Sequence, residues 1–252
     1  MEEISLKAQQ LFHIGNLPLT NGLLTTLVVS IALIILSLLL RSTMRTVPGK
    51  LQAAVEMGIE ALLNLMSSTL GSMEKAEKYF PLVATIFIFI LCSNLLGIFP
   101  GVGSLMFESG HVEVPLFRSP AADLNFTLAF AVISVIVTNI LGMTAVGSFK
   151  HIGKYLNFSN PINFFIGILE MISEFAKIIS LSFRLFGNVF AGEVLLTIIS
   201  FLAPYIVPLP FLMLELFVGM IQAFIFATIT LVSISLHITI HDAHDHEEAH
   251  AH

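Results

Sequence analysis

Residues 178–193 read IISLSFRLFGNVFAGE and place an arginine, an asparagine and a glutamate inside an apolar run. Arg184 stands near the middle of this run, and the charged residues closest to it are Lys177 and Glu193. A guanidinium keeps its charge at physiological pH, and at bilayer depth that charge is costly unless it is paired or faces water. The alternatives are snorkelling to the headgroups and pairing with a structural carboxylate. We interpret Arg184 as a functional residue within a membrane helix.

The overall composition agrees with a membrane location. The chain has 252 residues, of which 56% are hydrophobic and 11% charged, and its mean hydropathy is +0.93. These values exclude an ordinary soluble domain. The few basic residues lie at the ends of apolar runs, which argues against a nucleic-acid partner. A single cysteine, Cys92, excludes an intrachain disulfide and a thiol metal cluster.

The apolar runs predict an all-α polytopic membrane protein with five membrane-embedded helices and one amphipathic interfacial helix. The interfacial helix is expected at 48–73, where apolar residues recur at helical spacing among polar ones; packing against the protein itself is the alternative. Basic residues follow the first apolar run, so that run is predicted to be a retained helix and not a secretory signal. The chain forms one membrane domain, with an outer tail at 1–19 that includes an interfacial turn at 11–19, spans at 20–40, 79–99, 123–146, 161–203 and 209–241, and a His-rich tail at 242–252.

The last two apolar runs are too long for upright helices. As one helix, 161–203 would be about 60 Å long, twice the hydrocarbon core. Either it breaks near Gly187 and Asn188, or it is one helix lying steeply inclined. Three prolines between residues 203 and 210 predict a turn into the next run. We expect the two runs to form a long inclined hairpin.

The basic residues also predict the orientation in the membrane. By the positive-inside rule, the side with more lysine and arginine is cytoplasmic. We therefore expect a multi-pass protein of the bacterial cytoplasmic (inner) membrane, with its N-terminus outside and its C-terminus in the cytoplasm. The residues on the cytoplasmic side are Arg41, Arg45, Lys50, Lys75, Lys78, Lys150 and Lys154, against Lys7 and Arg118 on the other side.

The C-terminal sequence HDAHDHEEAHAH combines histidine with acidic residues. Such a tract could bind zinc or nickel weakly, but a solvated acidic tail is the favoured interpretation. We therefore expect no metal site and no cofactor.

Polar residues within 161–203 share one helix face. Seven residues separate Glu170 from Lys177 and Lys177 from Arg184, which places them in line along the helix. Glu174 is nearby, and Asn188 follows Arg184 by four residues on the same face. The helix therefore carries a polar track that leads from Arg184 toward the cytoplasm.

The last helix carries a matching pair, Glu215 and Gln222, seven residues apart. In an antiparallel hairpin, Glu215 should lie near the depth of Glu193, and Gln222 near that of Arg184. The arrangement suggests two aqueous half-pathways separated by a positive gate; simple polar contacts between helices are the alternative. The two outer carboxylates are interpreted as a proton relay, or alternatively as a structural pair.

Four segments resemble subunit a of the F-type ATP synthase: CSNLLGIFP at 92–100, PAADLNFTLAFA at 120–131, SFRLFGNVFAGE at 182–193 and GMIQAFIFATIT at 219–230. They occur in the family's order, and the resemblance extends from about residue 20 to residue 237. RLFGN followed by QAF is a specific pair of motifs. The tails are not covered.

The resemblance implies an ion-conducting, non-catalytic stator subunit. Such a subunit provides two half-channels that carry protons to and from the carboxylates of the c-ring, the rotor ring of c subunits, and so couples proton flow to rotation and ATP synthesis. The implied partners are the c-ring, subunit b of the peripheral stalk, the rest of the F1Fo ATP synthase and membrane lipid. Whether protons or sodium ions pass is left open.

The resemblance also implies roles for individual residues. Arg184 would be the essential gate that faces the c-ring carboxylate, with Asn188 and Gln222 supporting it. The outer half-channel would be lined by Glu193 and Glu215, with Asn94, Asp123 and Asn125 near its mouth. The inner half-channel would be bordered by Glu170, Glu174 and Lys177.

Two other function classes fit the sequence less well. A secondary transporter built on inverted repeats should show matched broken helices in its two halves. Here there is no internal repeat, and the two overlong runs are adjacent. An intramembrane enzyme is disfavoured because the sequence has no HExxH, no GxSxG and no paired aspartates in facing spans.

Overall fold

The computed structural model describes residues 9–14, 17–44, 48–99, 105–109, 112–147, 153, 155 and 161–249. Within these residues, five helices are long and apolar enough to cross a membrane, which confirms the predicted five-helix, all-α membrane fold. The expected outer tail before residue 9, most of the 150–160 loop and the last three residues of the His-rich tail lie outside the described residues.

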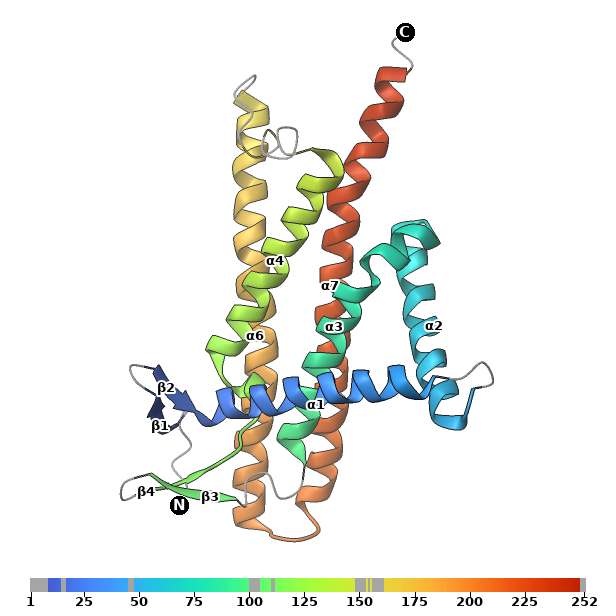
Figure 1. Ribbon diagram of the computed structural model, residues 1–252. Coiled ribbons are helices and arrows are strands. Elements are labelled where there is room, and N and C mark those ends of the chain that lie inside the picture. The colour runs from blue at the N-terminus through green and yellow to red at the C-terminus, as the bar shows by residue number, and fades with distance from the viewer. Residues whose placement is uncertain are drawn as a thin grey trace.

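Helix α1 (Asn21–Thr43) is capped by Thr20, whose Oγ1 accepts a hydrogen bond from the Leu23 amide. Its 23 residues correspond to a length of about 35 Å, close to the thickness of a bilayer core. Many of its apolar side chains are exposed, as expected for a helix surrounded by lipid. In Figure 1, α1 runs across the direction of the two longest helices.

Two short β-hairpins accompany the helices. Strand β1 (Gln10–Ile14) pairs antiparallel with β2 (Leu17–Thr20), and β3 (Met106–Ser109) pairs antiparallel with β4 (Val112–Pro115). The sequence interpretation did not include them. The first hairpin overlaps the expected interfacial turn at 11–19, and the second lies between the spans expected at 79–99 and 123–146. Pairing satisfies backbone N–H and C=O groups that a segment outside a helix would otherwise leave open.

Helix α2 (Lys50–Leu70) ends at Gly71, whose φ of 74° is a left-handed conformation that glycine adopts without strain. Its C-terminal half buries Met66 and Leu70 against α3 (Met73–Ile98) and α7 (Pro208–Ala249), whereas apolar residues near its start, such as Leu51, are exposed. One half thus packs on the protein, and the interfacial location of the other half remains a prediction.

The segment after β4 is tightly packed. The short 3-10 helix η2 (Pro120–Ala122) is buried, and Asp123 then caps α4 (Leu124–Val146) by accepting a hydrogen bond from the Asn125 amide. The expected helix start at Asp123 agrees with this cap. A Cβ at Gly97 of α3 would lie 2.4 Å from the Cβ of Ser119, so only glycine allows this approach.

Helices α6 (Pro161–Leu202) and α7 (Pro208–Ala249) are 42 residues each and form an antiparallel hairpin, seen side by side in Figure 1. Helix α6 is continuous through Gly187, so of the two alternatives the single long helix holds. One glycine is tolerated because a helix interior loses only about 1 kcal/mol to it. Helix α7 continues past the expected end at residue 241 and includes residues 242–249 of the His-rich tail.

Two apolar clusters hold the helices together. The first joins α3, α4, α6, α7 and η2, and the second joins α2, α3 and α7. Hydroxyl groups add links between helices: Ser134 and Thr230 lie 2.8 Å apart across α4 and α7, and Thr127 and Ser182 lie 3.1 Å apart across α4 and α6. Such contacts are common where helices pack in a membrane.

Candidate functional site

Arg184 lies on an exposed face of α6. Its Nη2 donates a hydrogen bond to Ser180 Oγ, one turn earlier, across 3.2 Å. Among the described residues, no carboxylate lies within ion-pair distance of Arg184. The guanidinium is therefore presented outward with most of its donors unused by the part of the chain that the structure describes.

A small pocket lies between α3, α6 and α7, and three of its polar atoms are unsatisfied. Within the described residues, the buried atoms Asn94 Oδ1, Ser119 Oγ and Glu215 Oε2 have no hydrogen-bond partner. All three residues line the pocket, together with Asn188 of α6. Buried polar atoms without a partner are costly, and water commonly satisfies them. The pocket thus brings together three residues that the sequence singled out, and adds Ser119.

The hairpin register brings Glu215 to the level of Glu193. A Cβ at Gly192 would lie 2.8 Å from Glu215 Oε1, so this glycine lets the Glu215 side chain lie directly against α6. The same contact agrees with the antiparallel alignment expected from the sequence. Asn94 completes the contact between helices, because its Nδ2 donates to the Gly219 carbonyl across 2.9 Å.

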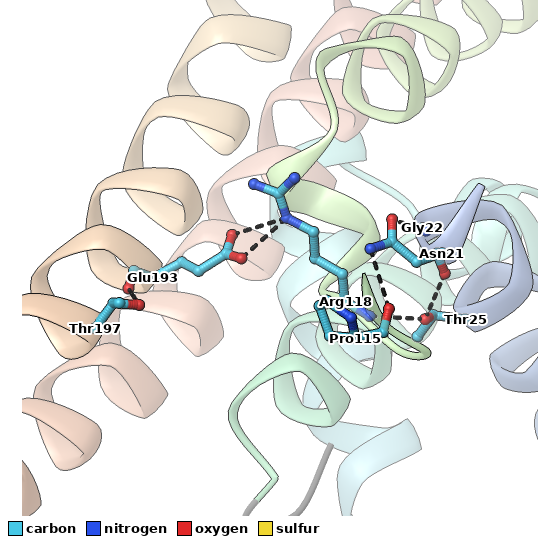
Figure 2. A network of polar contacts seen from close by, with 7 residues as sticks. All are labelled: Asn21, Gly22, Thr25, Pro115, Arg118, Glu193 and Thr197. Atoms are coloured by element: carbon cyan, nitrogen blue, oxygen red, sulfur yellow. Dashed lines mark hydrogen bonds and ion pairs between the residues drawn. The ribbon is translucent and has the colours of Figure 1, made fainter. Parts of the chain in front are cut away.

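Glu193 has a cationic partner that the sequence interpretation did not assign. Arg118, in the segment before η2, donates from Nε to both carboxylate oxygens of Glu193 at 2.9 and 3.2 Å, as Figure 2 shows. The Arg118 guanidinium also lies over the Phe190 ring, 5.9 Å from its centroid. Glu193 contacts a cation, whereas Glu215 lies at the pocket, so the two outer carboxylates have different surroundings.

The backbone around Arg118 is anchored to the start of α1. The Arg118 amide donates to Thr25 Oγ1 across 3.2 Å, and Asn21 Nδ2 donates to the Pro115 carbonyl across 3.3 Å (Figure 2). Asn21 and Thr25 are themselves fully buried. Helix α1 therefore helps to hold Arg118 in place opposite Glu193.

The other predicted residues are placed separately. Asp123 acts as the cap of α4, and Asn125 is exposed as the second residue of that helix; neither lines the pocket. Gln222 is buried on α7. The positions of Asp123 and Asn125 near the channel mouth and of Gln222 beside Arg184 remain predictions.

A second polar cluster joins α4, α6 and α7 farther along the hairpin. Lys177 Nζ donates to Glu174 Oε1 across 2.9 Å, and Asn139 Nδ2 donates to Glu174 Oε2 across 3.5 Å. His237 of α7 brings its Nε2 to 3.7 Å from Glu174 Oε1. Tyr155, between α4 and α6, donates its hydroxyl to Asn139 Oδ1 across 2.9 Å.

The electrostatic setting of this cluster is seen in Tyr155. Burial, together with the negative charges of Glu174 and Glu170, raises the pKa of Tyr155 to about 12. The tyrosine therefore stays protonated and acts as a hydrogen-bond donor at neutral pH. Glu170, Glu174 and Lys177, which the sequence assigned to one inner pathway, are thus part of one electrostatic neighbourhood.

Comparison with known proteins identifies the family. The ATP synthase A chain family matches residues 23–235. The chain belongs to the ATP synthase A chain family. ATP synthase subunit a of Trichlorobacter lovleyi is 33% identical over 93% of this chain and 94% of the relative, and that of Campylobacter jejuni is 35% identical over 92% and 91%. ATP synthase subunit a 3 of Pelobacter propionicus is 37% identical over 80% of each chain.

Membership of the ATP synthase A chain family places this protein in ATP synthesis and proton transport in a membrane. It also confirms the resemblance drawn from the four motifs. Sequence reasoning did not assign five residues that the structure brings into these polar clusters: Arg118, Ser119, Asn139, Tyr155 and His237. Of these, His237 carried a usable signal, because it is an isolated histidine in an apolar helix. It lies two residues beyond the part of the chain that the family matches.

Proposed function

We propose that the chain is the non-catalytic stator subunit that conducts protons past the c-ring of an F-type ATP synthase. The observation that carries this proposal is that Arg184 is exposed on α6 and has no carboxylate partner among the described residues, in a member of the ATP synthase A chain family. An arginine in this setting attracts a deprotonated carboxylate on a neighbouring protein. Because Arg184 does not release its own proton, it also blocks direct passage between the two half-channels.

The outer half-channel runs, in this proposal, through the pocket that contains Asn94, Ser119 and Glu215. Water in this pocket would satisfy the three open oxygens and connect the outer solution to Asn188, which lies one turn from Arg184. Protons from outside would reach the c-ring carboxylate by this route. Each rotor site must be protonated there before it enters lipid, because a bare carboxylate in lipid is costly.

The hairpin is proposed to lie inclined in the bilayer, against the c-ring. A 42-residue helix is about 63 Å long, whereas the hydrocarbon core is about 30 Å thick. Apolar residues are exposed near both ends of α6, including Phe165 and Phe201, which favours an apolar environment at both ends of the helix. Helix α1 has the length of a bilayer crossing and runs across α6 and α7 in Figure 1, as expected if α1 stands upright.

A first prediction concerns dependence on the rotor. The chain is expected to copurify with a ring of small, carboxylate-bearing membrane subunits and with subunit b and F1. Vesicles containing the chain alone should show no proton flux above protein-free vesicles, whereas vesicles with the assembled complex should acidify with ATP. A secondary transporter would work alone, so flux through the isolated chain would contradict the proposal.

A second prediction concerns orientation. With Cys92 replaced by serine, cysteines placed one at a time in the 150–160 loop and the His-rich tail should react with an impermeant thiol reagent from the cytoplasmic side. A cysteine at Leu105, which is exposed before β3, should react from the opposite side because an odd number of spans separates the two loops. Labelling of all three from one side would contradict the five-span arrangement.

A further inference from the structure

The inner end of the hairpin contains a histidine and a carboxylate that face each other. His237 of α7 is 3% exposed, and its Nδ1 lies 2.6 Å from the carbonyl oxygen of Ser233. A carbonyl oxygen only accepts hydrogen bonds, so Nδ1 must carry a hydrogen. The other ring nitrogen, Nε2, is therefore the one that gains or loses a proton, and it points at Glu174 Oε1 from 3.7 Å.

The contact between Nε2 and Oε1 favours a proton between them. With Nδ1 protonated, a neutral imidazole turns a lone pair toward the carboxylate, and two acceptors that face each other repel. A proton on either atom turns this repulsion into a charge-assisted hydrogen bond. We propose that His237 and Glu174 share an exchangeable proton and form a proton relay in the inner half-channel.

The charges around His237 and Glu174 allow this pair to bind and release a proton. Lys177 binds the same Glu174 oxygen and therefore competes with His237 for the negative charge of Glu174. Glu170 contributes a second negative charge to the same neighbourhood, as its effect on Tyr155 indicates. Two carboxylates and one lysine leave one negative charge, which a single proton on His237 neutralises. The surplus negative charge attracts a proton to the pair, and release of that proton to the inner water restores the surplus.

The other elements packed against this part of α7 add few titratable groups. Helix α4 contributes Asn139, which donates a hydrogen bond to Glu174, and the Tyr155 hydroxyl donates to Asn139. Helices α2 and α3 face α7 with the buried residues Met66, Leu70, Ala76 and Tyr79, of which Tyr79 is the titratable one. Within the described residues, the charged groups in the neighbourhood of His237 are thus Glu170, Glu174 and Lys177.

The relay connects to the gate along α6. Lys177 bonds to Glu174 and Arg184 bonds to Ser180, so polar side chains follow one another at steps of three or four residues from Glu174 to Arg184. In the synthesis direction, a proton released by the rotor carboxyl reaches Glu174 and moves to Nε2 of His237. It then leaves to water on the inner side, while Nδ1 keeps its own hydrogen. The relay rests on the proposed function and assigns a proton-transfer step to its inner half-channel. It agrees with protons as the coupling ion.

The test is made on the whole F1Fo complex in inverted vesicles, whose external medium is the inner side. His237→Gln keeps a hydrogen-bond donor for Glu174 but cannot carry a proton. We expect ATP-driven acidification to fall about three- to tenfold, less than the about 10²-fold or more for a proton-transfer group without an alternative, because water offers a slower route. The loss should grow as the external pH rises and should not depend on the pH inside the vesicle.

Ser235→Ala is the matched control, because Ser235 is two residues away on α7 and its hydroxyl donates to the Thr69 carbonyl of α2, away from Glu174. It should assemble and pump with the wild-type dependence on external pH. The double variant Glu174→Gln with His237→Gln should be no slower than the slower single variant, since both changes interrupt one relay.

Three results would overturn the relay. They are an assembled His237→Gln complex with the wild-type rate and external-pH profile, a Ser235→Ala complex with the same altered profile as His237→Gln, and a double variant whose losses multiply. The Arg184→Ala variant, measured in the same vesicles, distinguishes failure of the relay from failure of the proposed function. Pumping that is lost in Arg184→Ala and normal in His237→Gln rejects the relay alone; pumping that survives in Arg184→Ala rejects the proposed function.

Discussion

Replacing Arg184 with alanine is expected to abolish ATP-driven proton pumping by the complex, to below about 1% of the wild-type rate if the gate contributes the factor of 10² or more typical of a preorganised charge. The side chain is exposed on α6 and bonds Ser180 across 3.2 Å, so its loss should not unfold the chain. Without it, the proposed partner of the deprotonated rotor carboxylate is missing from this position. Acidification of inverted vesicles measures the effect.

Arg184→Lys should also be severely impaired, because lysine can lose its proton in a poorly solvated site and lacks the planar fork of the guanidinium. Arg41→Ala is a suitable control, since Arg41 is exposed in the last turn of α1. It removes the same side chain from the same protein and should pump normally. Near-normal pumping by Arg184→Ala in assembled complexes would reject Arg184 as the gate.

Glu215→Gln is expected to slow transport about tenfold or more, because a positioned proton-transfer group contributes about 10² to 10⁴-fold and water in the pocket replaces part of that. Glu215 Oε2 is buried at the pocket without a partner among the described residues, so it is free to bind a proton. The dependence of the rate on outside pH should change, whereas assembly with the rotor should survive. Transport between about pH 6 and about pH 9 is the measurement.

The variant Glu193→Gln tests whether Glu193 transfers protons or has a structural role. Glu193 is paired with Arg118 at 2.9 Å, so its loss leaves a mostly buried arginine without that partner and should weaken assembly as well as transport. Arg118→Gln together with Glu193→Gln should recover assembly. Glu60→Gln, at an exposed site on α2, is the neutral control. Wild-type rates across the pH range in assembled Glu215→Gln would leave Glu215 with a structural role only.

The Glu193 result also revises an expectation. The antiparallel hairpin predicted Glu193 and Glu215 at one level, and Glu215 lies against Gly192, next to Glu193 in the sequence. A relay shared by both carboxylates was one interpretation. The Arg118 contact makes the two unequal, because Glu193 is already neutralised by a cation. We now expect Glu215 to carry the outer proton transfer and Glu193 to position the segment around Arg118. Helix periodicity could not reveal this, since Arg118 is 75 residues away in the sequence.

The hairpin also combines features that are local to the sequence with a feature that packing decides. Its length was evident from an apolar run without strong breakers, and its turn from prolines, because both are local properties of the chain. Whether Gly187 and Asn188 interrupt α6 was undecided, since one glycine costs a helix only about 1 kcal/mol and packing decides the outcome. The structure has an unbroken helix there, packed on α4 and α7 through Leu185 and Val189.

The amino-acid sequence by itself determined the membrane fold, the five spans, the cap at Asp123 and the position of Arg184 in α6, because hydrophobic length and helical spacing act within one segment. Only the tertiary structure decided the contacts of Arg118 with Glu193, Asn94 with Gly219, and His237 with Glu174. Each of these contacts depends on the rotation and register of one element against another. Side-chain packing between elements sets those two quantities, and no periodicity within a single helix encodes them.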